Sequence, residues 1–194
     1  MARYAILTND LQYDLINKNE ERRKQVERFA PSMIRFLKKM REMNIPIVHL
    51  QLIYDEDDNH AELHNGVLPV LRGTKGAMIA QDYLDDRDII VEKNKDSGFF
   101  ETKLDERLKV LGVDTIVITG MQTQICVQTT AADAYFRGYH VIVPSDGVVS
   151  TRDSDKQRAL DWLASYCAVV SDLDSIERKI VDGTQFQFNV VPIP

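Results

Sequence analysis

Three side chains that together could perform nucleophilic catalysis follow three separate apolar segments of the sequence. Asp10 and Lys93 each come shortly after a short apolar run, and Cys126 lies a few residues after a third run, at the expected start of a helix. At a helix start the backbone dipole favours a thiolate and can bind an oxyanion, and a nearby lysine lowers the thiol pKa. A nearby carboxylate can carry the thiol proton. These residue types therefore predict a cysteine nucleophile with two charged partners.

Each of these residues taken alone has a more ordinary explanation. A single cysteine in a helix is more often a small core residue, and a single aspartate after a strand is more often a cap or turn former. A single lysine after a strand is more often exposed surface. What favours catalysis is that all three are expected at the same edge of one sheet.

The elements that would bring these residues together alternate along the chain. Apolar runs predict strands at residues 4–7, 47–50, 88–91, 115–119, 140–143 and 168–170, and amphipathic stretches predict helices at 20–43, 104–111, 125–136, 155–165 and 172–181. The alternation predicts a three-layer α/β/α, Rossmann-like fold with a mostly parallel six-stranded sheet and helices on both faces. In such sheets the site lies at the carboxyl ends of the strands.

Length, charge and cysteine content narrow the class of protein. The 194 residues fit one domain, with a core over about 4–180 and an extension at 183–194. The net charge of −6 argues against nucleic acid or an anionic membrane as the main partner. No run resembles a signal peptide or a membrane span, and two cysteines are too few for a disulfide scaffold. We therefore expect a cytoplasmic protein with a free thiol.

Three segments resemble the isochorismatase-like cysteine hydrolases, and the resemblance covers about residues 4–180. The segments are ILTNDLQYDL from residue 6, VEKNKDSGFFET from residue 91 and GMQTQICVQTTAADAYFRGYHVIVPSDGVVS from residue 120. The third is the most specific, because Gly-x-x-Thr-x-x-Cys-Val followed by Thr-Ala-x-Asp-Ala, a glycine turn, a strand and an aspartate is rarely met by chance. The first two agree with it in order and spacing.

The resemblance implies a function and a set of catalytic groups. It implies a triad of Asp10, Lys93 and Cys126, a cis peptide bond between Met121 and Gln122, and an oxyanion hole formed by the backbone N–H groups of Gln122 and Cys126. It also implies a homodimer or homotetramer. The predicted activity is cleavage of a C–N bond in a small amide, ureido or carbamoyl substrate through a cysteine thioester, with no metal or other cofactor.

Pocket residues are harder to predict. Gln12, Lys95 and Phe99 are candidates for substrate binding, and Lys95 could pair with a substrate carboxylate. Some family members carry a metal site built on Asp-x-His after the second strand, and that motif is missing here. His60 and His64 lie four residues apart and could share a helical face, but a solvated loop is the favoured interpretation.

Two other functions stay open at this stage. The family includes isochorismatase, which cleaves a vinyl ether, and a catalytically silent member could act as a binding protein. A thiol at the nucleophile position favours thioester chemistry over both. The alternating apolar residues at 184–194 are expected to pack on the protein's own surface or across a subunit interface.

Overall fold

The computed structural model describes residues 2–58 and 68–188, and the structural statements below concern those residues. The strands are β1 (Tyr4–Asn9), β2 (Ile47–Leu52), β3 (Ile89–Lys93), β4 (Thr115–Met121), β5 (His140–Pro144), β6 (Val148–Val149) and β7 (Val169–Ser171). The helices are α1 (Tyr13–Ile16), α2 (Glu20–Glu42), α3 (Leu104–Val110), α4 (Gln128–Phe136), α5 (Asp153–Tyr166) and α6 (Leu173–Asp182). Short helical turns are η2 (Lys75–Ala77), η3 (Gln81–Tyr83) and η4 (Thr123–Val127).

Every strand and helix predicted from the sequence is present. The prediction missed α1 and β6, which are too short to show a hydrophobic period. It also placed the start of the helix that carries Cys126 at residue 125, whereas the helical backbone begins with the π-helical turn η4 at Thr123. Both differences concern segments next to the predicted site.

The strands form one parallel sheet in the order β3-β2-β1-β4-β5-β7, and β6 pairs with β4 beside this path. All strand pairs are parallel. The predicted Rossmann-like α/β fold is therefore confirmed, and the count of six strands is corrected to seven because of the two-residue strand β6. The chain reverses its direction of travel across the sheet between β1 and β4, which is where such sheets open a crevice.

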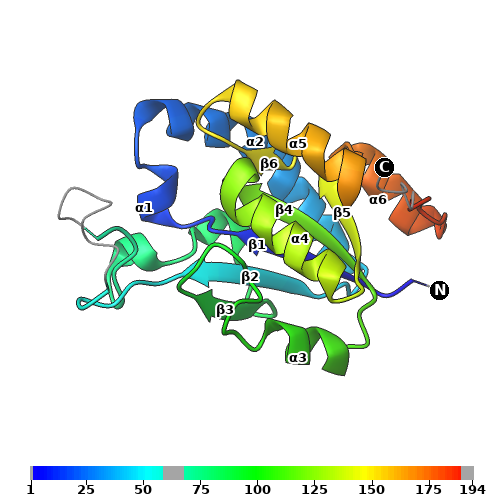
Figure 1. Ribbon diagram of the computed structural model, residues 1–194, viewed down its shortest axis with the longest axis horizontal. Coiled ribbons are helices and arrows are strands. Elements are labelled where there is room, and N and C mark those ends of the chain that lie inside the picture. Colours follow the sequence, from blue (N-terminus) through cyan, green and yellow to red (C-terminus); the bar gives the residue numbers. More distant parts are fainter. Residues whose placement is uncertain (1, 59–67, 189–194) are drawn as a thin grey trace.

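Helices cover both faces of this sheet, as Figure 1 shows. Strand β1 lies in the middle, and its side chains alternate between the two faces. Ala5 and Leu7 belong to the apolar cluster that also contains residues of α3, α4 and α5. Ile6 belongs to the opposite cluster, which contains residues of α2 and α6. The sheet is thus buried on both faces, and its carboxyl edge is left for the site.

Helix α2 shows how the sequence fixes one of these layers. The side chain of Asn19 accepts a hydrogen bond from the backbone N–H of Arg22 and caps the helix start. Apolar residues then recur at intervals of three and four, and they form the buried stripe Val26, Phe29, Met33, Phe36, Leu37 and Met40.

The described part of the C-terminal extension packs on its own chain without forming a strand. Phe186 is buried and meets the ring of Tyr4 edge-on at 6.4 Å, and Phe188 stacks on His140 at 4.3 Å. Residues 189–194 lie outside the described residues, so the subunit-interface version of the prediction stays a prediction. Across the described residues, no helix is long and apolar enough to span a membrane.

Candidate active site

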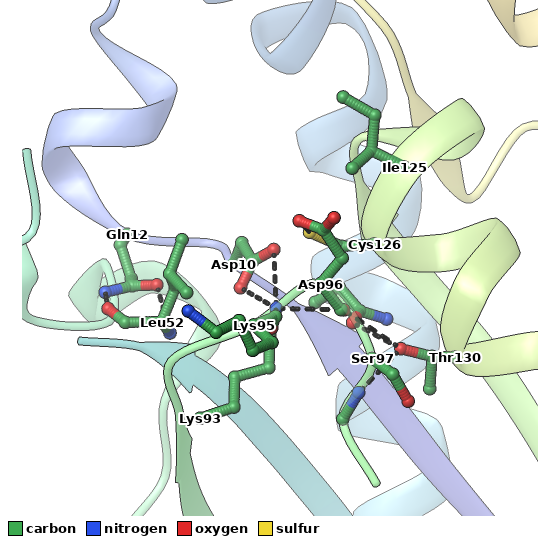
Figure 2. Close-up of polar contacts among 12 residues, drawn as sticks. Asp10, Gln12, Leu52, Lys93, Lys95, Asp96, Ser97, Ile125, Cys126 and Thr130 are labelled. Carbon is green, nitrogen blue, oxygen red and sulfur yellow. Dashed lines mark hydrogen bonds and ion pairs between the residues drawn. The ribbon is translucent and has the colours of Figure 1, made fainter. Parts of the chain in front are cut away.

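The three predicted catalytic residues meet at the carboxyl edge of the sheet. Asp10 directly follows β1, and Cys126 lies in η4, which follows β4. Lys93 was predicted to follow the third strand and is instead the last residue of β3. Because β2 separates β1 from β3, the long lysine side chain spans the width of one strand to reach Asp10 (Figure 2).

Asp10 and Lys93 form a buried ion pair. The Lys93 Nζ lies 3.0 Å from Oδ1 and 3.2 Å from Oδ2 of Asp10, and the two side chains are 0% and 3% exposed. The same ammonium donates to the backbone carbonyls of Lys95 and Asp96, each at 3.2 Å. A buried ammonium needs such partners, and here they also fix the loop that follows β3.

The backbone around Asp10 is held in a conformation that non-glycine residues seldom adopt. Asp10 has a φ of 57° and donates its N–H to the Leu50 carbonyl at 3.0 Å. On the adjacent strand β4, Gly120 pairs with Asn9 and has a φ of 97°, which leaves room for the backbone next to Asp10. A Cβ on Gly120 would lie 2.3 Å from the Asn9 carbonyl oxygen, so only glycine fits. This close approach brings the residue after β1 near the loop that carries the thiol.

The peptide bond between Met121 and Gln122 is cis, at the position that the family resemblance implies. The Gln122 carbonyl accepts hydrogen bonds from the N–H groups of Ile125 and Val127, each at 3.1 Å. These bonds close the π-helical turn η4, which holds Cys126 with its side chain nearly buried. The oxyanion hole at Gln122 and Cys126 stays a prediction.

The side chain of Gln122 is anchored by Thr151 and Arg22. Its Oε1 accepts from the Thr151 N–H at 3.2 Å, and its Nε2 donates to the Thr151 Oγ1 at 3.3 Å. Arg22, on α2, donates to that same hydroxyl through Nε at 3.2 Å and through a terminal nitrogen at 3.1 Å. The start of α2 is thereby connected by hydrogen bonds to the loop that carries Cys126.

Burial and neighbouring carboxylates oppose the thiolate that the helix position of Cys126 favours. Burial raises the pKa of the Cys126 thiol well above its ordinary value, and the negative charges of Asp10 and Asp96 raise it further. Lys93 lowers the pKa, as predicted, but it does not outweigh these effects. Thiolate formation therefore requires a base.

Asp10 has the properties of that base. Burial raises the pKa of the Asp10 carboxyl, and Lys93 opposes this rise. Burial alone would lower the pKa of Lys93, but the negative charges of Asp10 and Cys126 raise it, so the lysine stays protonated. Although Asp10 Oδ1 is paired in charge with Lys93, it accepts no hydrogen bond in the described structure. A buried carboxyl whose pKa is raised and whose side chain contacts the thiol is suited to take its proton.

Sequence reasoning missed two residues at this site. The Oδ1 of Asp96 lies 3.8 Å from the Cys126 sulfur. Tyr54 is buried two residues after β2, and burial together with the charges of Asp96 and Cys126 raises its pKa to about 12. Both follow strands that end at this edge, so the strand-end argument that found Lys93 could also have found them.

Two of the predicted substrate-binding residues have structural roles instead. The Gln12 Nε2 donates to the carbonyls of Leu52 and Ala77 at 2.8 and 2.7 Å, and its Oε1 accepts from the Leu52 N–H at 2.9 Å. Phe99 lies in the core and stacks on Tyr139 with ring centroids 5.9 Å apart. The amide of Gln12 and the ring of Phe99 are thus used by the fold. Lys95 is half-buried and lies in the loop that follows β3 (Figure 2), and its substrate role stays a prediction.

The two histidines within the described residues, His49 and His140, have partners outside the triad. His49 is buried with its Nδ1 2.6 Å from the Thr8 hydroxyl and its Nε2 3.0 Å from Asp88, whose carboxylate also pairs with Arg41. His60 and His64 lie outside the described residues. Within residues 2–58 and 68–188, no group of three or more His, Cys, Asp or Glu side chains is arranged to hold a metal ion.

Comparison of the sequence and the fold with known proteins identifies the family of this chain. Residues 4–175 match the Isochorismatase domain. The chain belongs to the isochorismatase family. The structure of an isochorismatase-like hydrolase from Alkaliphilus metalliredigens is 30% identical, with a TM-score of 0.84, over 92% of this chain and 100% of the other. An N-carbamoylsarcosine amidase from Thermoplasma acidophilum is 25% identical, with a TM-score of 0.77, over 90% and 98%.

A plant nicotinamidase has a sequence identity to this chain similar to that of the two solved structures. Nicotinamidase 3 from Arabidopsis thaliana is 28% identical over 73% of this chain and 74% of its own length. The similarity to these proteins confirms the family resemblance that the three sequence segments implied.

Proposed function

We propose that this isochorismatase-family protein hydrolyses a C–N bond of a small amide, ureido or carbamoyl compound through a thioester on Cys126. The observation that carries the proposal is the buried Lys93–Asp10 pair at 3.0 Å beside a nearly buried thiol. The similarity to proteins named as an amidase and a nicotinamidase supports the bond type.

In the first half-reaction, Asp10 takes the proton of Cys126 while the sulfur attacks the substrate carbonyl carbon. Lys93 stabilises the negative charge on the sulfur and keeps Asp10 oriented. The carbonyl oxygen becomes an oxyanion, which the backbone N–H groups of Gln122 and Cys126 bind. Asp10 then returns the proton to the leaving nitrogen, the C–N bond breaks, and ammonia or an amine departs.

In the second half-reaction, water replaces the departed amine. Asp10 accepts a proton from this water as its oxygen attacks the thioester carbon. The C–S bond breaks, the acid product leaves, and Asp10 returns the proton to the sulfur. The raised pKa of Asp10 suits both directions, because a base that must also act as an acid works best when its pKa is near the operating pH.

Ammonia release from a panel of small amides, ureido acids and nicotinamide tests the proposal, with a chelator present. Cys126→Ala should lose at least about 10³-fold in turnover, because the nucleophile is missing. Cys167→Ala is the matched control: this second buried thiol lies away from the triad, so its loss should leave turnover close to wild type.

Full activity of Cys126→Ala would refute the cysteine mechanism. Absence of ammonia release from every compound would refute the amide assignment, and turnover of isochorismate would then identify vinyl-ether cleavage.

A further inference from the structure

A carboxylate that the mechanism above does not use lies against the nucleophile. Asp96 is an exposed residue, whereas Cys126 is only 6% exposed. The Oδ1 of Asp96 lies 3.8 Å from the sulfur, and Figure 2 shows its carboxylate beside the thiol, on the side away from Lys93. An exposed acidic group is therefore in contact with a nearly buried thiol.

The backbone of Asp96 is fixed in this place. Its carbonyl accepts hydrogen bonds from Lys93 Nζ at 3.2 Å and from the Thr130 hydroxyl at 3.5 Å. The next residue but one, Gly98, donates its N–H to the same hydroxyl at 3.0 Å. The position of the Asp96 carboxylate next to the sulfur therefore follows from the same contacts that hold the catalytic lysine.

Within the part of the chain that the structure describes, the Asp96 carboxylate forms no ion pair, and its one side-chain hydrogen bond is accepted from the Cys126 thiol at 3.8 Å. Lys93 supplies one positive charge to the site, and Asp10 already neutralises it. A thiolate next to Asp96 therefore brings together two negative charges without a second counter-charge. A substrate that supplies a positive charge or N–H donors at this point would compensate the unpaired negative charge of this carboxylate.

The geometry of attack indicates which part of the substrate lies there. The carbon attacked by sulfur carries three other groups: the oxygen, which goes to the backbone N–H groups, the leaving nitrogen, which goes to Asp10, and one remaining substituent. The Asp96 carboxylate, whose Oδ1 lies 3.8 Å from the sulfur, is a polar group within reach of that substituent. In a simple amide that substituent is a carbon atom, whereas in a ureido or carbamoyl compound it is a second nitrogen with an N–H.

We propose that Asp96 accepts a hydrogen bond from this second N–H and so selects ureido and carbamoyl substrates over simple amides and over substrates with an anionic group there. The inference rests on the proposed function. With such a substrate the first half-reaction releases one nitrogen and leaves a thiocarbamate on Cys126. Water then releases a carbamic acid and restores the thiol.

Two measurements on Asp96→Asn test this inference, one of which needs no turnover. The first is the rate of Cys126 alkylation by neutral iodoacetamide and by anionic iodoacetate, followed by peptide mass spectrometry so that Cys167 is counted separately. The wild type should react about tenfold or more slowly with iodoacetate after correction for intrinsic reactivity, because the reagent's charge approaches Asp96. Asp96→Asn should lose most of this discrimination.

The second measurement is kcat/KM for a ureido compound and for the simple amide of matched size. The wild type should prefer the ureido compound, and Asp96→Asn should reduce that preference by about tenfold or more, because a hydrogen bond to a charged group is lost. Asp55→Asn is the matched control. It removes an exposed carboxylate that pairs with Arg72, and it should change neither ratio.

The outcomes separate this inference from the proposed function. Equal discrimination against iodoacetate in wild type and Asp96→Asn would overturn it, as would an unchanged ureido preference. If the alkylation result is as expected but neither compound is hydrolysed, the proposed function fails and the ureido assignment falls with it.

Discussion

The burial of the Lys93–Asp10 ion pair predicts how much Lys93→Met lowers the free energy of unfolding. Methionine has a similar length and no charge, so the variant keeps the volume of the side chain and leaves Asp10 buried without a cation. Breaking a buried ion pair by removing one partner typically costs about 3–5 kcal/mol. Asp10 can limit this cost, because it can take up a proton and become neutral.

The size of that limit depends on pH. A carboxyl with an ordinary pKa of about 3.9 costs about 1.4 kcal/mol to protonate for each pH unit above that value. Neutralising Asp10 thus costs about 4 kcal/mol at pH 7 and about 1.5 kcal/mol at pH 5. In the variant the folded state binds the extra proton, so its deficit in stability grows as pH rises and shrinks as pH falls.

Urea unfolding of wild type and Lys93→Met at these two pH values measures the prediction. The variant should lose up to about 4 kcal/mol at pH 7 and no more than about 1.5 kcal/mol at pH 5. Lys109→Met is the matched control, because Lys109 forms a pair with Asp105 at 2.6 Å while its side chain is 67% exposed. An exposed pair contributes at most about 1 kcal/mol, so this control should stay near wild type at both pH values.

A loss below about 1 kcal/mol at pH 7, equal to that of the control, would refute the claim that the pair is buried and coupled. A loss that is the same at both pH values would refute the assignment of the penalty to the unpaired Asp10 charge. In either case the variant should still lack turnover if Lys93 stabilises the thiolate.

Two further predictions concern the scaffold of the site. Gly120→Ala should destabilise the fold by about 1–3 kcal/mol and reduce turnover, because its Cβ would clash with the Asn9 carbonyl. Urea unfolding and an activity assay measure both effects. Gly138→Ala is the control: Gly138 has a similar φ but open space around it, so this variant should keep wild-type turnover. The partners of Asp88 lower its pKa to about 2, so the stability it confers is present above the ordinary carboxyl pKa and is lost as pH falls from about 4 towards 2. Asp88→Asn should lose less stability than wild type between pH 5 and pH 3, by about 1 kcal/mol, and equal slopes of unfolding free energy against pH would contradict this.

The sequence by itself determined the order of elements and the edge at which Asp10, Lys93 and Cys126 lie. Apolar runs and amphipathic periods are local properties, and they were sufficient to predict the parallel sheet. The rule that sites lie at the carboxyl ends of strands then placed three distant residues together. The short strand β6 was missed because two residues carry no period.

Only the tertiary structure decided how the groups at that edge are used. Gln12 and Phe99 were plausible pocket residues by position, but Leu52, Ala77 and Tyr139, all far away in sequence, occupy their amide and ring. Hydrogen-bond partners of this kind are fixed by packing between elements, which no local pattern encodes.

The direction of the pKa shift of Cys126 was decided in the same way. A helix start and a nearby lysine favour a thiolate, and both features were visible in the sequence. Burial of the sulfur and the approach of Asp96 to 3.8 Å raise the thiol pKa instead. Desolvation and short-range charge depend on the distances between folded segments, so the sequence could propose a nucleophile, while only the fold determined the direction in which the pKa of its thiol is shifted.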